Sequence, residues 1–376
     1  MQVKALMPLL CTLLLPLLNC QNTQKEIHFD KVQENPNQTE DQLQSAIYKG
    51  VEFLATSCSE QSLNEMDNWG KSCLGFAAMT MQKCGYKDGD FIKNLLKTSE
   101  AIVNEAKDQP LNDKGSDKED DNKRFYKIDA RMFNLFAGLT IDKDNYTSII
   151  MKNKKLIVER VFEEEDWGNG DFPYTLCDNI LAFVCDTIDE DTLPKKHWKI
   201  CRKITELRQV KGGGWSYNFH NCNIDDEGCE CNTDENDVSG IQTCSSIINL
   251  KLCFRKLDPN KKSAEFFKTG TIRKALEYLD KNFVPSSNPG EESKEKGKKG
   301  LYDCEYQFLF FLNAAIGDSG IKKLNSMDWQ DESVKYILKT QNKNGSWHSK
   351  AFHSDPISDT CFALLLLKKE FLTDLK

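Results

Sequence analysis

Several features that mark common protein classes are missing from this sequence. Basic residues are not in excess, because 50 lysine and arginine residues stand against 58 aspartate and glutamate residues, for a net charge of −8. Nucleic-acid-binding domains carry basic surfaces, so this balance argues against a nucleic-acid partner. A phosphate-cradling glycine loop is also missing, since Gly212 to Gly214 lead into Trp215 and a polar stretch and not into a helix start.

Long apolar runs are scarce beyond the amino terminus. Residues 5–18 are apolar, follow Lys4 and are too short to span a bilayer, so residues 1–20 are predicted to be a signal peptide. The end of this segment, Leu17-Leu18-Asn19-Cys20, leaves two interpretations open. Either Cys20 carries a lipid, in a pattern that resembles bacterial lipoproteins, or ordinary cleavage occurs nearby. In both cases the chain is exported, as a cell-envelope lipoprotein or a secreted protein. The polar residues 21–41 are predicted to be a flexible tether.

Cysteine is abundant, with 15 residues in the chain. An exported chain with this content is expected to hold several disulfide bonds, whose connectivity the sequence does not reveal. Residues 220–231 contain residue types that bind metals. Disulfide bonds that staple an exposed loop are the preferred interpretation, so no metal cofactor is expected. The alternatives are zinc bound by histidine and cysteine or a degenerate calcium loop; the residues concerned are His220, Cys222, Asn223, Asp225, Glu227, Gly228, Cys229 and Cys231.

A sustained strand pattern of period two is absent, and helical patterns recur instead. Near the carboxyl terminus, an amphipathic segment is followed by a Gly345-Ser-Trp347 turn, then Asp359, then an apolar run over 361–367. An apolar helix without a polar face must be enclosed, so this unit predicts an outer helix and a buried inner helix. Six such units follow one another, and each inner helix is preceded by a possible cap: Ser72, Asp129, Asp178, Asp237, Asp303 and Asp359. We therefore predict an all-α fold, a single (α/α)6 toroid over residues 42–376, with charged loops at 107–124, 216–236 and 286–300.

The turns between helices carry a motif of a known family. Gln341 is followed by Gly345 and Trp347, and Gln209 by Gly213 and Trp215. This Gln-x-x-x-Gly-x-Trp spacing resembles the repeat of squalene–hopene cyclases and related terpenoid cyclases. The resemblance implies the α/α toroid that these enzymes share with the β subunits of protein prenyltransferases. It also implies that Gln209, Trp215, Gln341 and Trp347 are structural braces and not catalysts.

The catalytic signatures of that family are not found in the sequence. The Asp-x-Asp-Asp acid of class II cyclases is absent, and so is the Asp-Asp-x-x-Asp metal box of class I synthases. The positions that resemble the prenyltransferase zinc ligands do not match either, because Asp303 and Cys304 are adjacent and Asp359 stands where the histidine would be. We therefore expect no cyclase chemistry.

The aspartates at the inner helix starts are the remaining candidates for a site. Parallel inner helices place their amino ends at one mouth of a toroid, where carboxylates raise one another's pKa. Asp237 and Asp359 follow complete repeats and are the candidate catalytic residues. Asp129, Asp178 and Asp303 are candidate ligand-binding residues. The simpler interpretation, which stays open, is that all five only cap helices.

Three functions are compatible with these observations, and the sequence leaves open whether the chain is an enzyme. The expected function is a binding or interaction protein without cyclase catalysis, with an unknown protein or an apolar small molecule as partner. One alternative is an enzyme on a terpenoid, lipid or glycan substrate that uses an aspartate as general acid. The other is a secreted carrier of a corrinoid-like cofactor. Phenylalanines of the inner helices, such as Phe76 and Phe362, either fill the centre or line a pocket.

Overall fold

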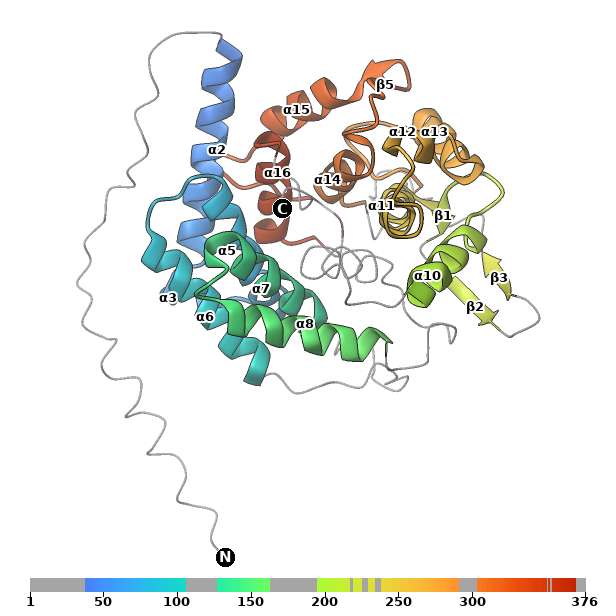
Figure 1. Cartoon of the computed structure of the whole chain (residues 1–376). Coiled ribbons are helices and arrows are strands. Elements are labelled where there is room, and N and C mark those ends of the chain that lie inside the picture. Colours follow the sequence, from blue (N-terminus) through green and yellow to red (C-terminus); the bar gives the residue numbers. More distant parts are fainter. Residues whose placement is uncertain are drawn as a thin grey trace, which may run out of the picture. The chain divides into compact units, whose positions relative to one another are not determined.

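The computed structural model of the chain describes residues 38–105, 127–162, 195–216, 219–224, 229–233, 238–290, 303–349, 351 and 354–369. These residues are mostly helical (Figure 1). Within this part of the chain, no helix has the length and apolarity that a membrane crossing requires. The first helix begins at Gln38, four positions before the predicted start of the toroid, so the end of the predicted tether is helical.

One set of helices is amphipathic and buries a single face. The outer helices are α2 (Gln38–Ser57), α6 (Gly89–Glu105), α8 (Thr147–Phe162), α10 (Lys195–Leu207), α13 (Gly270–Asn282) and α15 (Trp329–Thr340). In α6 the buried residues include Ile92, Leu95, Leu96 and Val103, which recur at the spacing of one helical face. The opposite face is left for charged side chains.

A second set of helices is largely buried. The inner helices are α5 (Leu74–Lys83), α7 (Lys127–Asp142), α11 (Gly240–Leu257), α14 (Glu305–Ile316) and α16 (Pro356–Leu367). Every residue of α16 after Pro356 is buried. The predicted third inner helix falls in residues 163–194, outside the described residues.

The inner helices pack side by side and return to their starting point. Helix α5 packs against α7, α11 against α14, and α14 against α16. Helix α16 in turn packs against α5 and α2, so the last unit lies beside the first (Figure 1). The all-α fold, a single α/α toroid, is thereby confirmed.

Short strands occur between the helices, although the sequence shows no sustained strand pattern. The strands are β1 (Trp215–Ser216), β2 (Phe219–Ile224), β3 (Cys229–Thr233), β4 (Val238–Ser239), β5 (Lys323–Leu324) and β6 (Met327–Asp328), paired as β1–β4, β2–β3 and β5–β6. The β2–β3 hairpin occupies the predicted charged loop 216–236, with Cys222 opposite Cys231. Its composition is polar, and this is why alternation of apolar residues did not reveal it.

Three short helices, α3 (Glu60–Leu63), α4 (Asn68–Ser72) and α12 (Ser263–Phe266), connect the longer ones. The predicted cap Ser72 is the last residue of α4, and Cys73 directly precedes α5. The prediction that Ser72 caps the first inner helix is therefore wrong. The reason is a short helix in the connection that the apolar pattern did not reveal.

The first Gln-Trp repeat joins the fourth unit to the fifth. The side-chain Nε2 of Gln209 donates to the carbonyl oxygens of Gly213 at 2.7 Å and of Thr271 in α13 at 2.8 Å. The indole Nε1 of Trp215, which is fully buried, donates to the carbonyl oxygen of Thr205 in α10 at 2.7 Å. One amide and one indole thus satisfy backbone carbonyls on two successive outer helices.

The second repeat has the same geometry and joins the sixth unit to the first. Gln341 Nε2 donates to the carbonyl oxygens of Gly345 at 2.9 Å and of Ala46 in α2 at 2.8 Å. Trp347 Nε1 donates to the carbonyl oxygen of Ile337 in α15 at 2.8 Å. This repeat therefore connects the two ends of the toroid.

A buried threonine ties each repeat to its inner helix. The backbone N–H of Trp215 donates to Thr243 Oγ1 at 3.2 Å, and that of Trp347 donates to Thr360 Oγ1 at 3.0 Å. Both threonines are fully buried. The motif as read from the sequence does not include them, because they lie far beyond the Gln-x-x-x-Gly-x-Trp span.

Candidate functional site at the amino ends of the inner helices

Of the five predicted aspartates, the structure describes the side chains of two, Asp303 and Asp359. Asp178 and Asp237 lie outside the described residues. Asp129 is in the first turn of α7, but its side chain is not described. Asp303 and Asp359 are buried, with 5% and 2% of their surface exposed. The candidate site is therefore described around Asp303 and Asp359.

The residue that caps α16 is Asp355, and not Asp359 as predicted. The Asp355 carboxylate accepts from the backbone N–H groups of Ile357 at 2.8 Å and Ser358 at 3.1 Å. Pro356 follows it at the first helical position. Proline is tolerated there because the backbone N–H that it lacks would have no partner within the helix. Asp359 lies one turn further along, inside the helix. The Asp-Pro pair is the sequence signal that could have identified this cap.

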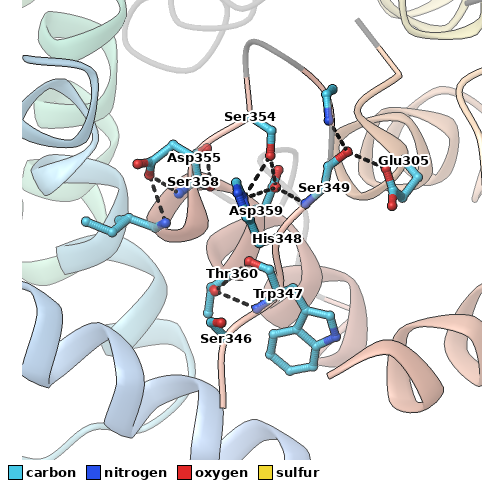
Figure 2. Close-up of polar contacts among 12 residues, drawn as sticks. Glu305, Ser346, Trp347, His348, Ser349, Ser354, Asp355, Ser358, Asp359 and Thr360 are labelled. Atoms are coloured by element: carbon cyan, nitrogen blue, oxygen red, sulfur yellow. Dashed lines mark hydrogen bonds and ion pairs between the residues drawn. The ribbon is translucent and has the colours of Figure 1, made fainter. Parts of the chain in front are cut away.

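Asp359 is the centre of a polar cluster with the segment that follows Trp347 (Figure 2). Its Oδ2 accepts from the backbone N–H of Ser349 at 2.7 Å and from the hydroxyl of Ser354. Its Oδ2 also lies 3.7 Å from Nδ1 of His348. Ser354 Oγ is 3.1 Å from the same Nδ1. Because the Ser354 hydroxyl has one hydrogen and gives it to Asp359, its oxygen accepts from His348.

Ser349 connects this cluster to the start of α14. Its hydroxyl is 2.9 Å from the carbonyl oxygen of Asp303 and 2.5 Å from Glu305 Oε2. The other oxygen of Glu305 accepts from the Tyr336 hydroxyl at 3.2 Å. Ser349 thus brings Asp303 and Asp359 into one network, together with Glu305, which the sequence analysis did not single out. We call His348, Ser349, Ser354, Asp359 and Glu305 the rim site.

A related cap covers the start of α11. Ser239, and not Asp237, directly precedes this helix, and its side chain makes no cap hydrogen bond. The cap is supplied by Asn288, whose Oδ1 accepts from the N–H of Ile241 at 2.9 Å. The backbone N–H of Asn288 donates to Asp303 Oδ1 at 2.7 Å. Asp303 therefore positions the segment that caps the preceding inner helix.

Burial and neighbouring charges shift the pKa values of groups in and beside the rim site. Burial raises the pKa of Asp355 to about 6, and the nearby carboxylates of Asp67 and Asp359 add to this effect. The interaction with Asp359 outweighs partial burial and raises the pKa of His348 above its usual value. Burial raises the pKa of Tyr306 to about 12 and, together with Glu305, also raises the pKa of Tyr336.

His348 is the most exposed member of this cluster. Its side chain is 44% exposed, whereas that of Asp359 is 3% exposed. An imidazole supported by a buried carboxylate can hydrogen-bond a ligand or transfer a proton near neutral pH. The sequence analysis did not use His348; its position one residue after the repeat tryptophan was the available signal.

Phenylalanine rings pack together between the inner helices. Phe76 of α5 stacks on Phe133 of α7 at 4.5 Å between ring centroids and meets Phe362 of α16 edge-on at 5.0 Å. Phe362 is also 5.3 Å from Phe310 of α14. Phe76, Phe310 and Phe362 are buried. Rings from four inner helices therefore pack against one another as core residues do.

The metal alternatives stay predictions. Among the described residues, no group of three or more histidine, cysteine, aspartate or glutamate side chains is arranged to hold a metal ion. The backbone of β2 and β3 is described, but the side chains of residues 220–231 are not.

Comparison with known proteins identifies the fold and not a family. No protein-family model matches the chain, and no curated protein matches its sequence. Its structure is similar to a crystal structure described as a possible member of the GH105 family, from Salmonella enterica serovar Paratyphi A, which is also an α/α toroid. The match covers 94% of this chain and 100% of that chain, with a TM-score of 0.54 and 10% sequence identity. At this identity, the likeness shows the α/α toroid that the two proteins share.

Proposed function

We propose that the chain is an exported binding protein that recognises a polyhydroxylated ligand, such as a glycan, at the rim site. The observation that carries this proposal is the contrast between two parts of the molecule. Hydroxyl, carboxylate and imidazole groups gather where α14 and α16 begin, whereas Phe76, Phe310 and Phe362 pack together between the inner helices. Hydroxyl-rich ligands suit the first environment. An isoprenoid would need an apolar pocket, whereas these rings are buried against one another.

The similarity to a possible GH105 member supports this ligand class over a terpenoid. The Gln-Trp repeats remain compatible with a terpenoid-cyclase-like origin. However, the Asp-x-Asp-Asp acid is absent from the sequence. For this reason the proposal includes binding but no cyclase reaction.

A ligand panel tests the proposal. Purified protein is screened by thermal shift, and hits by calorimetry, against neutral and acidic oligosaccharides, isoprenoid alcohols and cobalamin. We expect an oligosaccharide to bind and His348→Ala to weaken that binding at least about tenfold, since the imidazole is the most exposed group of the cluster. Lys343→Ala, an exposed change in the turn that precedes Trp347, is the matched control. Binding of an isoprenoid or cobalamin, but of no oligosaccharide, would contradict the proposal.

A second candidate function is acid–base catalysis on such a ligand. It is favoured by the pairing of half-exposed His348 with buried Asp359. In this arrangement His348 transfers the proton, and Asp359, the predicted general acid, orients it. The test is the release of new reducing ends from an oligosaccharide that binds. Binding without any release of reducing ends would support the binding function and reject the catalytic one.

Export and the lipid anchor are part of the proposal. The mass of the mature amino terminus, measured on protein from its own source, distinguishes a diacylated or triacylated Cys20 from an unmodified cleaved end. An intact Met1 with residues 2–20 retained would reject export through this segment.

A further inference from the structure

Two buried cysteines on adjacent helices lie next to each other. Cys201 of α10 and Cys253 of α11 have 8% and 0% of their surface exposed. The Cys201 thiol is 3.2 Å from Asn249 Oδ1, and the amide of Asn249 donates to Thr205 Oγ1 at 2.7 Å. Cys253 follows Asn249 by one helical turn, on the same face of α11. Cys201 is also the neighbour that acts most strongly on the Cys253 thiol, so the two sulfur groups lie side by side.

We propose that Cys201 and Cys253 form a disulfide bond when the chain folds in an oxidising compartment. The bond would join the outer helix α10 to the inner helix α11 within the fourth unit. Asn249 would keep its hydrogen bond to Thr205, so the bond would leave that polar contact in place.

Neither Cys361 nor Cys244 is matched with one particular cysteine in the same way. Cys361 of α16 is close to both Cys58 and Cys84, so three sulfur atoms share one neighbourhood there. Cys244 lies on the same helix as Cys253 and is fully buried, and its pKa is raised by burial alone. Cys244 therefore offers a matched control on α11.

The chemistry requires the bond to form during folding. The thiolate is the attacking species, and the interaction with Cys201, together with burial, raises the pKa of Cys253 in the folded protein. While the chain is still open, one thiolate attacks a small-molecule or protein disulfide and forms a mixed disulfide, and the second thiolate then displaces the carrier thiol. The two cysteines lose two protons and two electrons, and the disulfide oxidant is reduced to two thiols.

Refolding in a glutathione redox buffer, followed by alkylation, digestion and mass spectrometry, tests the proposal. We expect a linked peptide pair that contains Cys201 and Cys253 and that disappears in Cys201→Ser and Cys253→Ser but not in Cys244→Ser. Each of the first two variants should lower the melting temperature of the oxidised protein by about 5 °C relative to wild type. Under reductant this difference should become smaller, because only the contacts of the buried thiols then remain to be lost.

Two outcomes would overturn the inference. One is alkylation of Cys201 and Cys253 as thiols in protein that has refolded in the oxidising buffer. The other is a link from either cysteine to a different partner. Because the oxidant is supplied in the experiment, neither outcome depends on export or on ligand binding at the rim site.

Discussion

Gln341 donates its side-chain amide to the carbonyl oxygen of Ala46 at 2.8 Å, across 295 residues of sequence. The same amide reaches Gly345 in its own turn. A single side chain thus joins the connection after the last outer helix to the first outer helix. Gln209 performs the same role between the fourth and fifth units, where it bonds to Thr271. The toroid is therefore closed by the same contact that links two of its consecutive units.

Replacement of Gln341 tests this closure. In Gln341→Ala both amide hydrogen bonds are lost and two carbonyl oxygens lose a donor, so we expect the free energy of unfolding to fall by about 1–3 kcal/mol. Chemical denaturation measures the change. Gln44→Ala is the control, because the exposed Gln44 amide bonds only one turn away, to Glu40, and should change stability little. Equal stability of the two variants would show that the contact does not contribute to closure.

Two adjacent glycines offer a matched test of the repeat turn. Gly213 has a φ of +96°, and a Cβ there would lie 2.3 Å from the carbonyl oxygen of Lys274. A Cβ on Gly212 would meet nothing within 4 Å. We expect Gly213→Ala to lower the unfolding free energy by about 2–4 kcal/mol and Gly212→Ala to have an effect near zero. Thermal and chemical unfolding of both variants decide this, and a similar cost for the two would reject the packing argument.

The raised pKa of Asp355 predicts a stability that falls as pH rises. Its folded-state pKa is about 6 and its ordinary value is 3.8, so between these values the folded state binds more protons than the unfolded state. Stability should therefore decrease from about pH 4 to pH 6. Asp355→Asn keeps a capping oxygen without the charge, so we expect it to stabilise the protein at pH 7 by about 1–3 kcal/mol and to have little effect at pH 4.

The comparison of Asp355→Asn with Asp355→Ala separates the charge from the cap. The alanine variant removes the acceptor for Ile357 and Ser358 and should be destabilised at both pH values. Unfolding of the three proteins at pH 4 and pH 7 provides the measurement. An asparagine variant that is less stable than wild type at pH 7 would contradict the assignment.

His348 stabilises the folded protein when it is protonated and positively charged. Its contribution to stability therefore also decreases as the pH rises, as for Asp355. Its pKa is raised above 6.5 by Asp359, so its stabilising effect is complete below pH 6.5 and is lost as pH rises through the folded-state value. We expect His348→Gln to lower the melting temperature at pH 5 more than at pH 9. Proton NMR should show the His348 ring titrating above pH 6.5 in wild type and lower in Asp359→Asn. An unchanged midpoint in that variant would reject the pairing.

Local patterns in the sequence were sufficient to predict the helical fold. The wholly apolar run that includes Leu364 cannot face water on any side, and α16 is accordingly buried. The spacing from Gln341 to Trp347 likewise marked the turn between an outer and an inner helix. Such features depend on residues that are close in sequence, and for this reason they can be read without coordinates.

The cap of α16 is one feature that hydrophobic patterns predicted wrongly. The apolar run after Asp359 favours that residue as the cap, but the helix begins after Asp355, where Pro356 fixes the backbone. The β2–β3 hairpin was missed for a similar reason, since polar strands give no alternation of apolar residues. Both errors concern short-range geometry that hydrophobicity alone does not determine.

The sequence by itself determined that apolar inner helices alternate with amphipathic outer ones, because burial of apolar side chains depends on local composition and period. Only the tertiary structure decided which polar groups meet. Ser349 joins Asp303, Glu305 and Asp359, and Gln341 reaches Ala46, because packing of distant helices brings their ends together. Hydrogen bonds require donors and acceptors within about 3 Å, and no pattern along the chain encodes that distance.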